Sequence, residues 1–292
     1  MDNFIVLYNP LAGNGTAQDK MRELESLMQG DRLYFSNMLD IRDYGAFFND
    51  MPDGASIIIC GGDGTLNEVL QGVIGCPNAA VGCVPCGSGN DFARDIGAER
   101  GAPPVLINRY IERLPKICVN GKEHRFINGI GYGIDGYCCE KGDELRGKGN
   151  GEVNYTAIAI KGLLFHYKPT GATITVDGVE HRFEKVWLAP TMIGRYYGGG
   201  MMPTPEQDRL NGDGAVSVMV YYGSGKLKSL AVFPSIFKGE HIKHSEMVAV
   251  LSGRNITVCF DEPRPLQIDG ETVPGVREYS VTACEEKVLQ PA

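Results

Sequence analysis

Residues 57–70 read Ile-Ile-Ile-Cys-Gly-Gly-Asp-Gly-Thr-Leu-Asn-Glu-Val-Leu. The apolar, β-branched run at the start predicts a buried strand, and the glycines after it predict a tight turn. A helical pattern begins at Thr65, which can cap the helix together with Glu68 three residues on. We therefore expect Asp63 at the carboxyl end of a strand, where ligands bind in open α/β sheets.

The composition of this turn favours phosphate binding. Gly61, Gly62 and Gly64 can take positive φ and, without a Cβ, let the backbone approach a bulky group. The following helix start offers free N–H groups and the positive end of the helix dipole. A glycine-rich turn without a ligand is the alternative. Asp63 argues against it, because a carboxylate in such a turn is unfavourable without a cation or proton partner.

Two further loops have a similar character. Residues 86–94 read Cys-Gly-Ser-Gly-Asn-Asp-Phe-Ala-Arg after an apolar segment at 79–85, so Asp91 follows Asp63 by 28 positions (91 minus 63) in a second strand–turn–helix unit. Two such units are what two loops closing on one nucleotide require. The strand predicted at 4–8 also ends in a glycine-bearing loop, a common phosphate site. That loop is not a Walker A motif, because no Gly-Lys-Ser/Thr follows.

The texture of the sequence changes after Pro103-Pro104. Before it, helical patterns at 17–28 and 43–51 alternate with apolar segments, including one at 32–39, as in an α/β domain. After it, short strand-like segments with Asn-Gly and Asp-Gly turns predict a β-rich second domain. The strands are expected at 116–120, 125–128, 173–176, 185–188, 216–222, 248–251, 255–260 and 265–268, with helices at 153–167 and 227–237.

Composition limits the function classes. The chain has 292 residues, enough for two domains, and its net charge of −8 argues against a nucleic-acid-binding protein. Nine cysteines without regular spacing and the lack of a secretory leader favour a reducing cytoplasm. The lone pair Cys83 and Cys86, like Cys138-Cys139, is interpreted as buried and structural. No apolar stretch reaches the length needed to span a bilayer.

Residues 61–68 resemble the nucleotide-binding signature of the diacylglycerol kinase and sphingosine kinase family. NAD kinases share the first four residues and phosphofructokinases are similar. Residues 87–93 resemble the Gly-Thr-x-Asn-Asp-Phe-Ala segment of the lipid kinases, with Ser88 keeping the hydroxyl of the usual threonine. The Asn9-Pro10 loop resembles the family's first motif, although Asn14 stands where some members carry Lys or Arg. The separate downstream Asn-Glu motif of NAD kinases has no equivalent.

The resemblance implies a two-part architecture. Residues 1–114 would form an α/β, Rossmann-like nucleotide domain of the NAD kinase and phosphofructokinase type. Residues 115–275 would form a β-rich, sandwich-like lipid domain, and the tail at 276–292 would return to the first domain.

The resemblance also implies the site. ATP is expected to be held by Asn9, Gly62, Asp63, Gly64, Thr65, Leu66, Asn67, Glu68, Ser88, Asn90 and Asp91. Mg²⁺ would be organised through water by Asp63, Asp91 and Asp135, although an Asp in a β-turn is the plain alternative for Asp135. Glu271 is the expected catalytic base, with Asp63 as its rival. A structural Mg²⁺ is expected on Asp213 and the backbone oxygens of Leu210 and Ala215, because a hard cation prefers oxygen ligands.

The expected function is an ATP-dependent lipid kinase that phosphorylates a primary hydroxyl of a diacylglycerol-like lipid. A soluble-substrate kinase of the NAD kinase type is the alternative. Asn14 and Ser88 depart from the usual family pattern and so suggest a non-catalytic nucleotide-binding module. The presence of Asp63, Asp91 and Glu271 argues against it. The protein is expected to be cytoplasmic and to dock transiently on a membrane, assisted by basic residues such as Lys226, Lys228, Lys238 and Lys243. The sequence does not decide whether the protein forms a homodimer. His241 and His244 are interpreted as part of a solvated or cleft-rim loop rather than as a metal pair.

Overall fold

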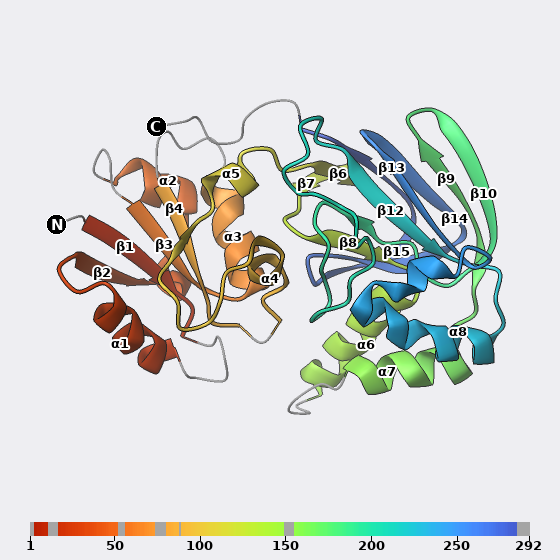
Figure 1. Ribbon diagram of the computed structural model, residues 1–292, viewed down its shortest axis with the longest axis horizontal. Helices are drawn as coiled ribbons and strands as arrows, with labels where there is room; N and C mark the ends of the chain where they lie inside the picture. Colours follow the sequence, from red (N-terminus) through yellow and green to blue (C-terminus); the bar gives the residue numbers. More distant parts are fainter. Residues whose placement is uncertain are drawn as a thin grey trace. The chain divides into compact units, whose positions relative to one another are not determined.

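The computed structural model describes residues 3–10, 17–51, 56–73, 80–87, 89–148 and 155–284. The chain divides into two compact units with the boundary between Leu114 and Pro115, and each unit is described by itself (Figure 1). Two residues that bear on the expected nucleotide site, Asn14 and Ser88, lie outside the described residues.

Unit 1 is an α/β domain around a five-stranded sheet of order β2-β1-β3-β4-β5, in which the first four strands are parallel and β5 runs antiparallel to β4. The strands are β1 (Asn3–Tyr8), β2 (Arg32–Asn37), β3 (Ser56–Gly61), β4 (Ala80–Pro85) and β5 (Val105–Leu106). The helices are α1 (Ala17–Leu27), the 3₁₀ turn η2 (Met38–Asp40), α2 (Tyr44–Asn49), α3 (Asp63–Val73), α4 (Asp91–Ile96) and α5 (Asn108–Ile111).

Alternation of side chains explains the two faces of this sheet. Val6, Ile58 and Cys60 point to one face and pack against Leu24 of α1. Their strand neighbours point to the opposite face, and α3 contributes buried leucines and a valine to the core. The strand order reverses between β1 and β3, so the carboxyl ends of these two strands form the switch point where ligands bind in such sheets.

Unit 2 is a ten-stranded antiparallel sheet of order β13-β12-β11-β8-β14-β15-β6-β7, with β9 joining β14 to β10. Its strands are β6 (Lys116–Val119), β7 (Lys122–Arg125), β8 (Gly129–Tyr132), β9 (Thr170–Val176), β10 (Val179–Val186), β11 (Thr191–Met192), β12 (Val216–Tyr221), β13 (Val248–Gly253), β14 (Asn255–Ile268) and β15 (Glu271–Thr282). Its helices are α6 (Ile134–Gly147), α7 (Tyr155–Lys161), the π-helical η3 (Gly162–His166), α8 (Lys226–Val232) and the 3₁₀ helices η4 (Phe233–Lys238) and η5 (Glu240–Lys243).

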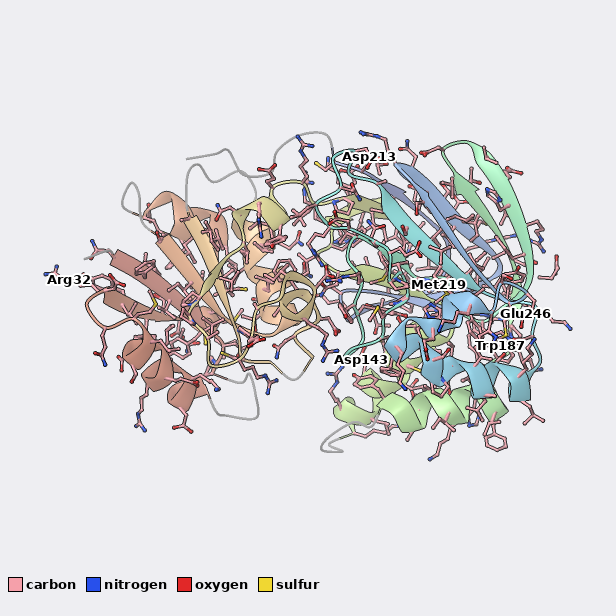
Figure 2. The ribbon with its side chains drawn as sticks, in the orientation of Figure 1. Arg32, Asp143, Trp187, Asp213, Met219 and Glu246 are labelled. Atoms are coloured by element: carbon pink, nitrogen blue, oxygen red, sulfur yellow. The ribbon has the colours of Figure 1, made fainter. Side chains whose placement is uncertain are left out.

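The helices α6, α7 and α8 lie together on one side of unit 2 (Figure 1). Between them and the strands is a core cluster that includes Trp187 and Met219, both labelled in Figure 2. The Trp187 indole N–H donates to the carbonyl of Ser224 at 3.0 Å, so its polar atom is satisfied inside the core. The helices thus cover one face of the strands, and their outer sides form part of the surface of the unit.

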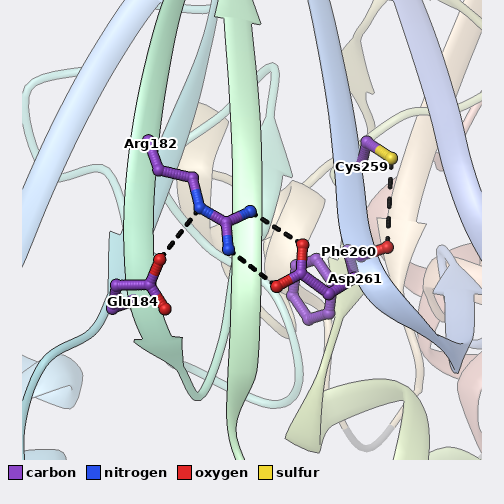
Figure 3. A network of polar contacts seen from close by, with 5 residues as sticks. All are labelled: Arg182, Glu184, Cys259, Phe260 and Asp261. Carbon is purple, nitrogen blue, oxygen red and sulfur yellow. Dashed lines mark hydrogen bonds and ion pairs between the residues drawn. The ribbon is translucent and has the colours of Figure 1, made fainter.

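Strand β14 contains both the strand predicted at 255–260 and the strand predicted at 265–268. It pairs with β9 through residues 256–260 and with β8 through residues 266–268, and its register against β15 shifts between these two parts. Beside the bend, the Arg182 guanidinium of β10 makes two 2.7 Å hydrogen bonds to Asp261 and one of 3.0 Å to Glu184 (Figure 3). This forked pair links β10 to β14.

Several local expectations are wrong. Helix α3 begins at Asp63, so Thr65 lies inside its first turn and cannot form a capping box with Glu68. Gly61, Gly62 and Gly64 do not have positive φ. Residues 126–128 connect β7 to β8 rather than forming a strand.

The second half of the chain also differs from expectation in three places. The tail does not leave the second domain at 276, because β15 continues to Thr282 and pairs with β14 and β6. Residues 285–292 lie outside the described part. Helix α6, which contains Asp135, was not predicted, so the β-turn interpretation of Asp135 is wrong. His241 is fully buried and its Nε2–H donates a 2.9 Å hydrogen bond to the Pro203 carbonyl, so it does not belong to a solvated loop.

Candidate functional site

The two glycine-rich turns of unit 1 pack directly against each other. A Cβ placed on Gly87 would lie 2.4 Å from the Cα of Gly62, and a Cβ on Gly62 would lie 2.9 Å from the Cα of Gly87. A Cβ on Gly61 would lie 2.4 Å from the Thr65 side chain. These three glycines are therefore required by the packing of the protein itself, whether or not a ligand also approaches.

Asp63 joins the two turns. One carboxylate oxygen accepts the Asp91 amide at 2.9 Å and the other accepts the Phe92 amide at 2.8 Å. These amides belong to the first two residues of α4, where a helix leaves its N–H groups without intrahelical partners. Asp63 thus caps α4 from a different element, and its negative charge lies at the positive end of the α4 dipole.

Asn90 holds the second turn instead of capping the helix. Its backbone is left-handed, with φ of 53°, and its side chain makes no cap hydrogen bond to α4. The side-chain oxygen accepts the Gly87 amide at 2.9 Å, and the side-chain nitrogen donates to the Gly87 carbonyl at 2.7 Å. The Asn90 side chain thus holds the Gly87 backbone, and Asp63 supplies the cap that Asn90 does not provide.

The outer side of the first turn of α3 is open. A Cβ on Gly64 would have no heavy atom within 4 Å, whereas a crevice on the inner side, lined by residues such as Gly62, Leu66 and Phe92, has a volume of only about 10 Å³. That is room for about one water molecule. The first intrahelical bond is donated by the Leu66 amide to the Gly62 carbonyl, so the amides before Leu66 have no acceptor within the helix. The outer side of this turn is therefore open beside Gly64.

The remaining predicted nucleotide residues have different environments. Thr65, Leu66 and Asn67 are buried, and the Asn67 side-chain oxygen accepts a 2.9 Å bond from Gln71. Glu68 is exposed and accepts a 3.4 Å bond from the Tyr44 hydroxyl. Asn9 directly follows β1, at the switch point. The structure thus brings Gly62, Asp63, Gly64, Asn90 and Asp91 together, and turns the other side chains toward the interior or along the helix surface.

The cysteines near this site are buried, as expected for Cys83 and Cys86. The close pair is not the sequence neighbours, however. The Sγ atoms of Cys60 and Cys86 are 2.8 Å apart, where β3 and β4 end side by side. The hydrogen bond between the two thiols raises the pKa of Cys60 and lowers that of Cys86.

In unit 2, Glu271 follows a two-residue hairpin turn between β14 and β15. Asp269 and Gly270 have φ of 46° and 97°, the left-handed pair that Asp-Gly hairpins adopt. The Asp269 carboxylate accepts the amides of Ile127, Asn128 and Gly129 at 2.6, 2.9 and 3.0 Å. Asp269 therefore clamps the chain that leads into β8, and Glu271 is left exposed at the start of β15.

Gln267 connects Asp135 to the same hairpin. Its side-chain nitrogen donates to the Asp135 carboxylate at 2.9 Å, and its side-chain oxygen accepts the Gly270 amide at 2.6 Å. Gln267 therefore links Asp135 to the hairpin that carries Glu271, although 136 positions separate these two predicted site residues (271 minus 135). Burial raises the pKa of Asp135 to about 6, and hydrogen bonds from Gln267 and Tyr197 oppose the rise.

Sequence reasoning missed Gln267 and the role of Asp269. A glutamine inside the otherwise apolar end of β14 was the available signal, because a buried amide needs hydrogen-bond partners. These partners lie on α6 and in the turn between β14 and β15, and no local sequence pattern predicts them.

One of the three predicted ligands of the structural Mg²⁺ has surroundings that do not suit a metal ligand. The Asp213 carboxylate accepts the Ala215 amide at 3.2 Å in a local turn. The Ala215 carbonyl accepts 2.8 Å bonds from both Gln207 and Asn211, which occupy its two lone pairs, so this oxygen does not fit a metal ligand as it stands. Asp213 and Leu210 stay predicted ligands. Within the described ranges, no group of three or more His, Cys, Asp or Glu residues is arranged to hold a metal ion.

Comparison with known proteins covers nearly the whole chain. Residues 3–116 match the family model described as the diacylglycerol kinase catalytic domain, and residues 128–285 match the YegS C-terminal NAD kinase beta sandwich-like domain. A protein of Mycobacterium tuberculosis (strain H37Rv) named diacylglycerol kinase is 28% identical over 81% of this chain and 77% of its own length. A diacylglycerol kinase of Bacillus subtilis (strain 168) is 29% identical over 74% of this chain and 70% of its own.

A solved structure supports the fold. The crystal structure titled as a diacylglycerol kinase from Bacillus anthracis str. Sterne aligns with a TM-score of 0.62 and 19% identity, covering 99% of this chain and 95% of that chain. The second family model alone spans more than half of the 292 residues. The predicted combination of an α/β domain and a β-rich domain is thereby confirmed, and the chain belongs to the bacterial diacylglycerol kinase and lipid kinase family of phosphotransferases.

Proposed function

We propose that this protein is an ATP-dependent lipid kinase that transfers the γ-phosphoryl group to a primary hydroxyl of a diacylglycerol-like lipid and forms a lipid phosphate. The observation that carries the proposal is the Asp63 bridge, which sets the N-termini of α3 and α4 beside each other at the carboxyl edge of the sheet. The names of the Mycobacterium and Bacillus relatives support the lipid acceptor.

The first turn of α3 would bind the ATP phosphates. Its amides and the dipole of the helix both favour an anion, and the open side at Gly64 leaves room for one. Phosphoryl transfer depends mainly on positioning and on stabilising negative charge, which backbone amides provide without rearranging. Asn9 and Asn90 belong to the loops that border this turn.

Mg²⁺ fits the donor set of unit 1. This ion commonly uses one or two carboxylates together with substrate phosphates and water rather than a cage of protein ligands. Asp63 begins α3 and Asp91 begins α4, and the hydrogen bond from the Asp91 amide to the Asp63 carboxylate holds these two residues together. Bound with the nucleotide, Mg²⁺ would neutralise charge on the phosphoryl group being transferred.

Glu271 is the better candidate for the base. Both Asp63 oxygens accept hydrogen bonds from α4 amides, so protonation of Asp63 would weaken the bonds that connect the two glycine-rich turns. Glu271 is exposed and sits on a hairpin that Asp269 and Gln267 hold from two sides. A carboxylate so held can take the proton of an acceptor hydroxyl.

The test is ATP turnover with Mg²⁺ against diacylglycerol in mixed micelles, a sphingoid base and NAD, using wild type, Glu271→Gln and Gly64→Ala. We expect phosphorylated lipid from the wild type, a loss of about 100-fold or more in kcat for Glu271→Gln, and a raised KM for ATP in Gly64→Ala. Phosphorylated NAD with inert lipids would overturn the lipid acceptor and establish the soluble-substrate alternative. Full activity of Glu271→Gln would remove Glu271 from the reaction.

A further inference from the structure

The helical side of unit 2 exposes two large apolar side chains. Within η3, Leu163 and the following Tyr167 are buried while Phe165 between them is 73% exposed; within α8, Val232 is buried and Leu227 is 79% exposed. These are the two most exposed large hydrophobic residues in the described part of the chain. Ile160 of α7 is also exposed. The outer faces of these helices thus carry apolar residues where water would favour polar ones.

The two residues belong to neighbouring elements. The Lys226 ammonium at the start of α8 donates a 2.8 Å hydrogen bond to the Leu164 carbonyl in η3. Figure 1 shows α7 and α8 running along the same side of the unit. We call Ile160, Phe165 and Leu227, together with Lys161, Lys168, Lys226 and Lys228, the docking face.

Basic residues flank both apolar positions. Lys226 and Lys228 stand on either side of Leu227, and Lys161 and Lys168 stand before and after Phe165. The acidic side chains recorded beside these lysines are paired. Glu246, labelled in Figure 2, lies 2.8 Å from Lys228, and Glu262 lies 2.8 Å from Arg264. Glu246 therefore offsets the charge of Lys228, whereas Lys161, Lys168 and Lys226 have no ion pair among the described residues, so the docking face keeps a net positive charge on a chain whose net charge is −8.

This combination selects one kind of partner. Exposed aromatic and aliphatic side chains among lysines match the boundary between acyl chains and anionic headgroups. No helix among the described residues is long and apolar enough to cross a membrane. We propose that the docking face binds reversibly to a bilayer that contains anionic phospholipid, with Phe165 and Leu227 inserted below the headgroups. The proposal rests on the proposed function for its purpose, since a lipid acceptor lies in such a bilayer, but its test does not require catalysis.

The first measurement is co-sedimentation with sucrose-loaded vesicles, either of phosphatidylcholine alone or mixed with phosphatidylglycerol. Phe165→Ser/Leu227→Ser is expected to lower the partition coefficient by about tenfold or more, because two apolar side chains no longer enter the bilayer. Val179→Ser is the matched control, since it changes an exposed aliphatic residue of the same unit on the β9–β10 hairpin. Thermal unfolding midpoints establish that all variants are folded.

The lysines give a second measurement. Lys161→Gln and Lys168→Gln should each weaken binding about fivefold on the mixed vesicles and have little effect on pure phosphatidylcholine. Lys243→Gln is the control, because that ammonium lies 3.0 Å from Glu240 outside the docking face. Equal binding by the apolar double variant and the wild type would overturn the proposal. So would a wild-type dimer that the double variant dissociates, because the face would then bind a second copy.

Catalysis separates this proposal from the proposed function. The double variant should keep the wild-type kcat and KM on a short-chain diacylglycerol dissolved as monomers, and lose activity only on substrate in vesicles. Wild type that binds the mixed vesicles but phosphorylates none of the lipids would uphold the docking face and overturn the kinase assignment.

Discussion

At the scale of single residues, the glycines of the signature have unlike roles. Gly62 contacts the backbone of Gly87, and Gly61 contacts Thr65, whereas Gly64 faces open space. The same motif therefore serves the packing of two turns and, under the proposed function, access for the phosphates of ATP.

Gly62→Ala and Gly64→Ala separate these requirements. The Gly62→Ala methyl would meet the Gly87 Cα at 2.9 Å, so we expect a loss of about 1–3 kcal/mol in unfolding free energy. Gly64→Ala should stay within about 0.5 kcal/mol of wild type and yet raise the KM for ATP. Urea unfolding and steady-state kinetics measure the two effects. An unchanged KM in a folded Gly64→Ala protein would place the phosphates elsewhere.

Asp135 makes stability depend on pH. Burial raises its pKa from 3.8 to about 6, so between these values the folded protein holds a proton that the unfolded chain has released. Stability contributed by this group is complete below about pH 3.8 and falls as pH rises through 6, by about 3 kcal/mol at most. Asp135→Asn is neutral at every pH and should not show this fall.

Urea unfolding of wild type and Asp135→Asn at several pH values between 4 and 7 measures the effect. The difference between the two proteins should shift in favour of Asp135→Asn as pH rises. Parallel curves would show that Asp135 has an ordinary pKa in the folded protein.

At the scale of elements, the β14–β15 hairpin combines a structural and an exposed carboxylate two positions apart. Asp269 accepts three backbone amides, and Glu271 is exposed. The turn also holds α6, because Gln267 bonds both Asp135 and Gly270, and Thr272 donates to Asp143 at 2.7 Å. A change in the turn therefore reaches the helix.

Asp269→Ala should destabilise the protein by about 3–5 kcal/mol, since it leaves three amides without their acceptor and puts alanine at a left-handed position. Asp269→Asn should lose less, because asparagine tolerates that conformation and keeps one oxygen. Glu271→Gln should remain within about 0.5 kcal/mol of wild type while losing activity. Chemical unfolding of the three variants checks the order. A stability loss in Glu271→Gln equal to that of Asp269→Ala would argue that both carboxylates are structural.

At the scale of the whole molecule, the chain forms two units with separate cores. We expect calorimetric unfolding to depart from a single two-state transition. Asp63→Asn should lower the transition of unit 1 by weakening the α4 cap, Asp269→Ala should lower that of unit 2, and an ATP analogue should raise only the first. One cooperative transition that moves in all three experiments would show that the units unfold together.

Local patterns predicted much of the framework. The apolar runs at 4–8, 57–60 and 79–85 are strands, and the helix predicted at 17–28 is α1, within a residue or two at each end. Strand and helix periodicity act over a few neighbours, so a single chain displays them. The predicted breaks at 261–264 and 276 failed because pairing partners decide whether an extended segment continues, and these partners lie far away in sequence.

The sequence by itself determined the class of the protein: the glycine-rich turns, their aspartates and the change of texture after Pro103-Pro104 pointed to an α/β nucleotide domain followed by a β-rich domain, and the family comparison agrees. Only the tertiary structure decided what each residue does there. Asp63 caps a helix 28 positions later, Asp269 clamps a loop more than a hundred positions earlier, and Gln267 joins Asp135 to the hairpin of Glu271. The physical reason is that a buried hydrogen-bonding group takes whichever partner the fold brings near it, and that choice has no local signature.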